Sequence, residues 1–245
     1  MQGTGQTIPA GQQRGAAPGQ GGRGGGQRPE VPPIPPEFQA AKIMTLDSPQ
    51  LVQILKDPAA TVFQKGKACM RLAMVGTKDA VPALAAMLGE QQLADYARFG
   101  LVPIPDPSVD DALRGALKKL KGKLLVGVID SIGQRKDAKA VEPLAELIYG
   151  ADAEVAQAAA AALGRISGPR ATEALQSGLA KTKGPVRAAV AAAGLVCADG
   201  LLAKGERKQA FALYDVLSRP DIPKPVRLAA MHGTIAAETS LSRPR

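Results

Sequence analysis

The residue types that most often carry out chemistry in proteins are scarce in this sequence. There is one histidine, His232, and there are two cysteines, Cys69 and Cys197. A structural zinc site takes about four cysteine or histidine ligands, and a lone histidine cannot complete a histidine-based metal centre. The sequence therefore predicts no catalytic residue, no cofactor and no metal site. Both cysteines are expected to be small buried side chains.

Three aspartates lie close together around two prolines, at Asp106, Asp110 and Asp111. Paired carboxylates can act as a general acid and base, but no histidine or further acid accompanies these three. An aspartate directly before a helix also accepts hydrogen bonds from the free backbone N–H groups of the first turn. We therefore interpret the cluster as the capped start of a helix.

The strongest local concentration of charge is a group of four lysines, Lys118, Lys119, Lys121 and Lys123. The whole chain carries 31 lysines and arginines against 22 acidic residues, a net charge of +9. Clustered lysines can bind phosphate groups, which would suit nucleic acid or another polyanion. Lysines are also favoured at the C-terminal end of a helix by its dipole. The four lysines are candidates for partner binding, and both interpretations stay open.

The overall composition favours helices. Alanine occupies 44 of the 245 positions, and aromatic residues make up 3%. Small aliphatic side chains suit closely packed helices, whereas strands are rich in β-branched and aromatic residues. The longest strongly apolar uncharged run, Ala188–Ala198, is shorter than the roughly 18–20 residues of a membrane span. We expect an all-α chain without a membrane span.

The sequence repeats with a period of about 30 residues. One kind of segment occurs as DAVPALAAML, SVDDALRGAL, DAKAVEPLAELI and RATEALQSGL, and a second apolar segment follows each of them. Both kinds place apolar residues at helical spacing. Two helices in each unit of this length are typical of an α-solenoid, in which every unit packs on its neighbours.

We predict a right-handed α-solenoid of about six helix pairs over residues 37–245, beginning near residues 48, 78, 108, 137, 170 and 205. The first helices are expected on the convex face and the second helices on the concave face. Residues 1–36, which are rich in glycine, glutamine and proline, are predicted to be a disordered tail and linker.

Two local features refine this prediction. Gly76, Gly133, Gly168 and Gly200 are expected where helices end, since glycine is common directly after a helix. The last pair carries Tyr214 and a proline-interrupted connection, and it looks more like a tetratricopeptide hairpin than its neighbours do.

The segments DAVPALAAML (Asp79–Leu88) and AEVAQAAAAALGRISG (Ala153–Gly168) resemble HEAT repeats of the phycobilisome-lyase type. The stretch Tyr96–Leu144 is more specifically similar to a bacterial group of HEAT-repeat proteins. The resemblance covers about residues 46–238 and implies scaffolding or protein binding without catalysis. No residue identifies a chromophore pocket of the lyases.

Members of that bacterial group are usually exported and continue with further repeats, whereas this sequence shows no signal sequence and stops after a repeat-like helix. The resemblance therefore implies a periplasmic or cell-envelope location if an export signal precedes the chain, and a cytoplasmic location otherwise.

The expected function is a non-catalytic scaffold whose concave surface binds another protein. Arg165, Arg187 and Arg227 are the further candidates for contact with this partner, because the planar guanidinium pairs with carboxylates. The alternative for each arginine is an internal ladder that bonds an acid or carbonyl of the adjoining repeat.

The alternative function is nucleic-acid or polyanion binding along a basic stripe, as in the HEAT-like fold of DNA glycosylases but without their catalysis. Such enzymes hold a flipped base against aromatic side chains, particularly tryptophan. This chain has no tryptophan, and its aromatic residues are scattered, at Tyr96, Phe99, Tyr149, Phe211 and Tyr214.

Overall fold

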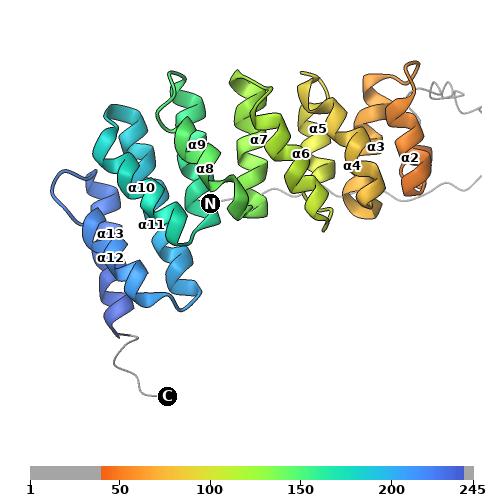
Figure 1. Cartoon of the computed structure of the whole chain (residues 1–245). Coiled ribbons are helices and arrows are strands. Elements are labelled where there is room, and N and C mark those ends of the chain that lie inside the picture. The colour runs from red at the N-terminus through yellow and green to blue at the C-terminus, as the bar shows by residue number, and fades with distance from the viewer. Residues whose placement is uncertain (1–39, 240–245) are drawn as a thin grey trace, which may run out of the picture. The chain divides into compact units, whose positions relative to one another are not determined.

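The computed structural model describes residues 40–239, which form helices and contain no strand. After the short α1 (Ala40–Ile43), the helices follow one another in six pairs (Figure 1). The pairs are α2 (Ser48–Lys56) with α3 (Val62–Val75), α4 (Val81–Ala86) with α5 (Ala94–Leu101), α6 (Pro107–Leu117) with α7 (Gly122–Arg135), α8 (Val141–Leu147) with α9 (Ala153–Ile166), α10 (Pro169–Lys181) with α11 (Gly184–Ala203), and α12 (Arg207–Leu217) with α13 (Lys224–Thr239).

The predicted all-helical repeat solenoid is confirmed over this range. Each of the six pairs begins within about two residues of its predicted start when the short 3₁₀ turns before α4 and α8, Lys78–Ala80 and Ala138–Ala140, are counted with their pairs. The tail assigned to residues 1–36 lies outside the described residues. Its boundary stays a prediction, as do the right-handed sense of the stack and the tetratricopeptide character of the last pair.

Short polar side chains start several of these helices. Asp47 accepts a hydrogen bond from the backbone N–H of Gln50, whose side chain bonds back to the Asp47 N–H. Thr61 and Gln64 repeat the same reciprocal arrangement before α3. Asp106 accepts the N–H of Ser108 at 2.9 Å, so the aspartate cluster does begin a capped helix, α6. Such caps satisfy N–H groups that have no partner inside the helix.

Two of the four glycines assigned to helix ends are placed differently. Gly76 ends α3 and Gly168 precedes α10, as expected, but Gly133 lies inside α7 and Gly200 inside α11. A Cβ atom on Gly133 would lie 2.9 Å from the Cα of Ala162 and 2.8 Å from the Arg165 Nε. The prediction was wrong here because this glycine permits the close approach of α9 rather than a turn. Helix α7 instead ends at Arg135, and Lys136 directly after it has a φ of 55°.

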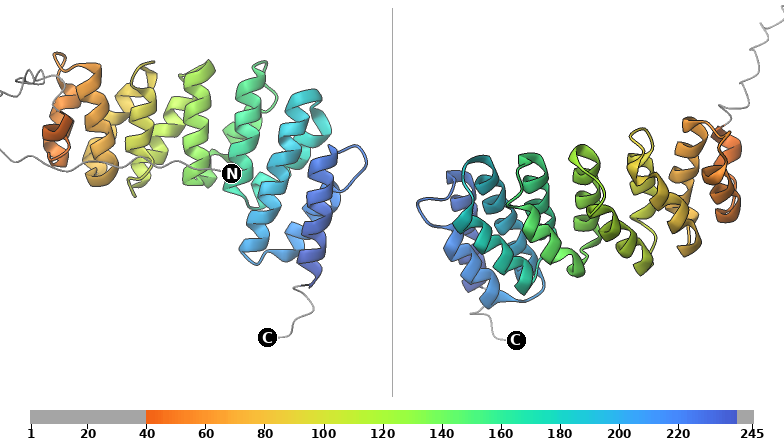
Figure 2. Two further views of the ribbon diagram at one scale, coloured as in Figure 1. Left: turned by 180° about the vertical axis from the view of Figure 1, so that it is seen from behind. Right: turned by 45° about the horizontal axis from the view of Figure 1, so that its top comes forward.

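The second helices form the more closely packed layer of the stack. Contacts between α7 and α9 and between α9 and α11 are the most extensive between any two elements. The packed side of α9 consists mainly of fully buried small side chains, including Ala156, Ala159 and Ala160. Methyl groups occupy little space, so α9 approaches the backbones of α7 and α11 closely. Figure 2 shows the second helices side by side in chain order.

Helix α11 is the one described helix that is long and apolar enough, by length and composition, to cross a membrane. The uncharged run Ala188–Ala198 is only part of it, so the sequence run alone underestimated the helix. These criteria are weak evidence for a span, because the core helix of a stack meets them too. Here α11 packs against α9, α10, α12 and α13.

The placement of Leu163 gives a direct test of the repeat register. Its side chain is fully buried on α9, so Leu163→Ala removes buried methyl groups and should lower the free energy of unfolding by about 2–5 kcal/mol. Val196→Ala is the control, since Val196 is 47% exposed on α11 and its truncation should cost less than about 1 kcal/mol. Urea unfolding of both variants measures the difference. Equal midpoints would contradict this register.

Candidate functional site

Arginine side chains join the repeats, and Arg135 makes the largest number of these bonds. Its guanidinium donates to the carbonyls of Val102 and Ile104 at 2.8 Å each and to the Asp106 carbonyl at 3.1 Å. It also pairs with the Asp110 carboxylate at 2.5 Å. One side chain of α7 therefore donates hydrogen bonds to three carbonyls of the connection between α5 and α6 and holds this connection against α7. The side chain is 12% exposed, so solvent cannot readily replace these bonds.

Two further arginines reach α7 from opposite sides. Arg98 on α5 donates to the Gly127 carbonyl at 3.0 Å, and Arg165 on α9 donates to the Asp130 carboxylate at 2.8 Å. Gly127 gives Arg98 its space, because a Cβ atom there would lie 2.5 Å from the guanidinium carbon. Arg98 also pairs with Asp95 of its own helix at 2.5 Å.

Of the three arginines proposed for partner contact, Arg165 and Arg187 bond to an adjoining repeat, as the internal ladder requires, whereas Arg227 bonds within its own pair. Arg165 bonds to α7 as described, and its Nε has no partner within the described residues. Arg187 on α11 donates to the Leu179 carbonyl at 3.0 Å and to the Asp221 carbonyl at 2.7 Å in the next pair. Arg227 donates to the Pro220 carbonyl at 3.1 Å. Bracing between repeats thus accounts for the geometry of Arg165 and Arg187, and contact with a partner stays a prediction for all three arginines.

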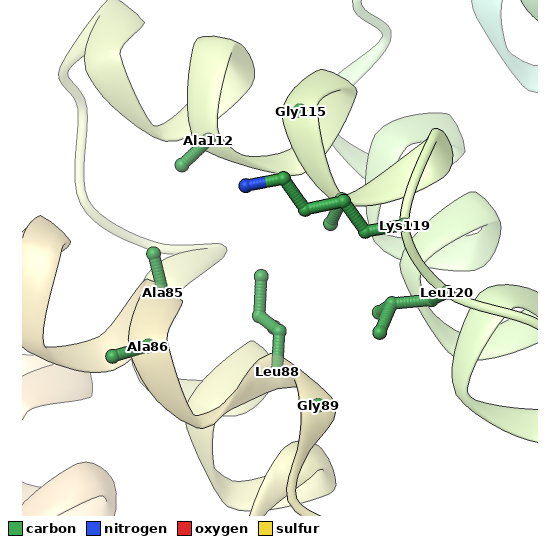
Figure 3. Close-up of a pocket in the computed structure, with 9 residues that line it drawn as sticks. Ala85, Ala86, Leu88, Gly89, Ala112, Gly115, Lys119 and Leu120 are labelled. Atoms are coloured by element: carbon green, nitrogen blue, oxygen red, sulfur yellow. The ribbon is translucent and has the colours of Figure 1, made fainter.

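The four clustered lysines are exposed around the turn between α6 and α7, and no described acid forms an ion pair with them. Lys118 and Lys119 do not lie on one patch. Lys118 lines a groove beside Glu142 and Glu146 of α8, whereas Lys119 lies over the opposite groove, beside α4 (Figure 3). Residues 140–164 contain four acids and no basic residue, so the basic stripe is interrupted there.

The groove under Lys119 lies between the first helices α4 and α6 and has a volume of about 490 Å³. Figure 3 shows that small and aliphatic side chains line it, and Lys119 is the only charged residue among them. An ammonium group above alanine and glycine provides neither a nucleophile–base pair nor a metal ligand set. The groove therefore offers no chemistry beyond contact.

Exposed apolar side chains gather on the second helices. Nine large apolar side chains of the described residues are exposed, and eight of them belong to second helices. The eight are Val62, Met74, Tyr96, Phe99, Val196, Leu228, Met231 and Ile235. We call the surface that they share the second-helix face. Tyr149, after α8, is the ninth.

Two grooves on this face flank α5. The α3–α5 groove is lined by Phe63 and Tyr96, and the α5–α7 groove, of about 360 Å³, is lined by Phe99. Tyr96 and Phe99 are therefore not scattered: with Phe63 they form one aromatic region. The signal in the sequence was the spacing of three residues between Tyr96 and Phe99, which places both on one side of a helix. Tyr214, by contrast, is buried and donates to Asp199 at 2.5 Å.

The remaining chemically reactive residues have structural surroundings. Cys69 on α3 and Cys197 on α11 are both buried and free. Burial raises the pKa of the Cys69 thiol to about 12, so the reactive thiolate is scarce near neutral pH. His232 is exposed on α13. Among residues 40–239 no group of three or more histidines, cysteines or acids could hold a metal ion.

The role of Arg135 predicts a large stability effect. Arg135→Met removes the guanidinium donor of the Val102 carbonyl and leaves the Asp110 carboxylate without its ion pair, which should cost about 3 kcal/mol. Arg170→Met is the matched control, since Arg170 is exposed on α10 and forms no bond of this kind. Urea unfolding gives the two values. Similar losses in both variants would mean that Arg135 does not join the repeats.

The pair of Arg187 and Asp221 predicts a dependence on pH. The hydrogen bond from Arg187 lowers the pKa of Asp221, so its stabilising contribution is present above the ordinary value of about 4 and is lost as the pH falls through the lower folded value. Arg187→Gln should therefore lower the melting temperature more at pH 7 than at pH 2. The Leu179 carbonyl bond should leave a smaller difference at pH 2. A difference that is the same at both pH values would exclude this pairing.

Comparisons with known proteins agree with the repeat architecture. Residues 105–195 match the family described as HEAT repeats. Two solved structures, "Crystal Structure of Engineered Protein. Northeast Structural Genomics Consortium Target OR329" and "Designed armadillo repeat protein YIII(Dq)4CqI", are each 18% identical with a TM-score of 0.44. Each alignment covers 78% of this chain, and 97% and 100% of the two structures, respectively. No curated protein matches the chain. The described chain is an all-helical repeat solenoid, and its residues 105–195 match HEAT repeats.

Proposed function

We propose that this solenoid is a non-catalytic scaffold that binds another protein on its second-helix face. The observation that carries the proposal is the distribution of exposed apolar side chains, eight of nine of which lie on second helices. Single exposed apolar residues are common, but their concentration on one face marks an interaction surface. The activity implied by the bacterial HEAT-repeat resemblance, scaffolding or protein binding, supports the same function.

The packing of the two layers supports this choice of face. At most junctions between repeats the second helices contact one another more extensively than the first helices do. In a curved stack the more closely spaced layer lies on the inner side, where an extended surface is presented to a partner. The second-helix face is therefore the expected concave surface.

The charges favour a protein over a polyanion. The six ion pairs of the described residues all join an arginine to an aspartate, so these arginines are already engaged. Of the lysines at the α6–α7 turn, Lys118 and Lys119 line two different grooves on the first-helix side. Binding along a nucleic-acid backbone needs several cations in a continuous track. Polyanion binding is kept as the outcome that the experiment distinguishes.

The test compares two exposed aromatic side chains. Phe99, which is 57% exposed, lies on the second-helix face, and Tyr149, which is 47% exposed, lies outside it. The full chain carrying Phe99→Ala should capture its specific partners from native extract at least about tenfold less well than the unchanged chain, as expected for an interface anchor. Tyr149→Ala should capture them normally. Quantitative mass spectrometry of the bound proteins measures both.

Melting temperatures within a few degrees of each other would show that the variants remain folded. Equal capture by the unchanged chain and Phe99→Ala would contradict the proposal. Capture that depends on nucleic acid and disappears with nuclease treatment would favour the polyanion alternative instead.

A further inference from the structure

The α3–α5 groove of the second-helix face has the dimensions of a side-chain pocket. It has a volume of about 130 Å³ and is lined by Val62, Phe63, Gly66, Lys67, Met70 and Tyr96. Pockets for small molecules usually measure about 300–1,000 Å³. This groove is too small for such a ligand but has room for one apolar side chain.

A close contact between α3 and α5 shapes the groove. The ring of Tyr96 lies against Gly66, where an added Cβ atom would be 3.4 Å from the Tyr96 Cδ2. A methyl group at position 66 would touch the ring, so the ring faces Gly66 across the groove, and the Tyr96 residue is 42% exposed. Met70 lies in the same lining, and its flexible thioether side chain can adapt to the shape of an inserted group. The walls are thus apolar and partly preformed.

Lys67 is the only charged residue in this lining. Its Nζ lies 5.5 Å from the centre of the Phe63 ring, and none of the ion pairs within residues 40–239 includes it. On the neighbouring helix α5, Asp95 already forms an ion pair with Arg98. A lysine that lacks a carboxylate partner at the edge of an apolar pocket complements an acidic group.

We propose that this groove binds a partner segment in which an aspartate or glutamate lies beside an apolar anchor residue. The anchor fills the space between Phe63, Met70 and Tyr96, and the acidic group pairs with Lys67. The proposal rests on the proposed function and adds the chemistry of the partner. One free cation and a ring already covered by Lys67 fit such a peptide better than a nucleic-acid strand, which needs several cations and free ring faces.

The experiment is a selection of displayed random 12-residue peptides on the immobilised full chain. The unchanged protein should enrich peptides with aspartate or glutamate next to leucine, isoleucine, methionine or phenylalanine. A synthetic copy of an enriched peptide should bind at least about tenfold more weakly to Lys67→Glu and to Tyr96→Ala. Lys208→Glu is the matched control for charge, since Lys208 is exposed on the first helix α12, and it should bind the peptide normally.

Each other result overturns the proposal. Enrichment without an acidic preference, or no enrichment above empty beads, contradicts the inferred chemistry. Equal binding to the unchanged chain and Lys67→Glu contradicts the assigned site. If Phe99→Ala still reduces partner capture in these cases, the proposed function stands and only this inference fails. If Phe99→Ala has no effect either, both fail.

Discussion

The stack depends on arginine side chains that supply hydrogen bonds where one repeat meets the next. In the connection between α5 and α6, Arg135 donates to the carbonyls of Val102, Ile104 and Asp106. Backbone N–H groups also reach the Ile104 and Asp106 carbonyls, so Arg135 adds to the backbone bonding of this connection and supplies the side-chain donor for Val102. Buried carbonyls without donors are costly, so packing of these repeats requires this side chain or an equivalent. The alanine-rich layer of second helices provides close packing, but contacts between methyl groups do little to fix the relative orientation of neighbouring helices. The arginines fix this orientation, because the N–H groups of a planar guanidinium point in set directions and bind acceptors only there.

Close contact and arginine bonding also explain which features could be read from the sequence. The repeat period placed all six pairs correctly, because each pair must bury its own apolar side chains and so carries the pattern locally. The role of Gly133 was missed because a glycine that ends a helix and a glycine that admits Arg165 look the same in one dimension. Tyr96 and Phe99 were missed as a group for a related reason. Their surface, together with Phe63, exists only after α3 and α5 have packed side by side.

Neighbouring charges in the sequence give a misleading view of the surface. Lys118 and Lys119 are adjacent, yet they line grooves on opposite sides of α6, because consecutive helix-end residues differ in direction by about 100°. The net charge of +9 therefore does not concentrate where the sequence suggests. Arginines act mainly within the stack, and exposed lysines are spread around it. The face that carries the aromatic region has a single free lysine in its small groove, which makes partner recognition there depend on shape as much as on charge.

The junction between the α4–α5 and α6–α7 pairs differs from the others. Its second helices share the fewest contacts of any neighbouring second helices, and grooves of about 490 and 360 Å³ lie on its two sides. The cooperativity of a linear array is set by its nearest-neighbour interfaces, and the weakest interface limits it. The described helices belong to one compact unit, and this junction is held by contacts of α4 with α6 and α5 with α7 together with the bonds of Arg98 and Arg135. A small rotation about this junction would widen one groove and narrow the other, so a partner seated against Phe99 would be sensitive to the bending of the protein.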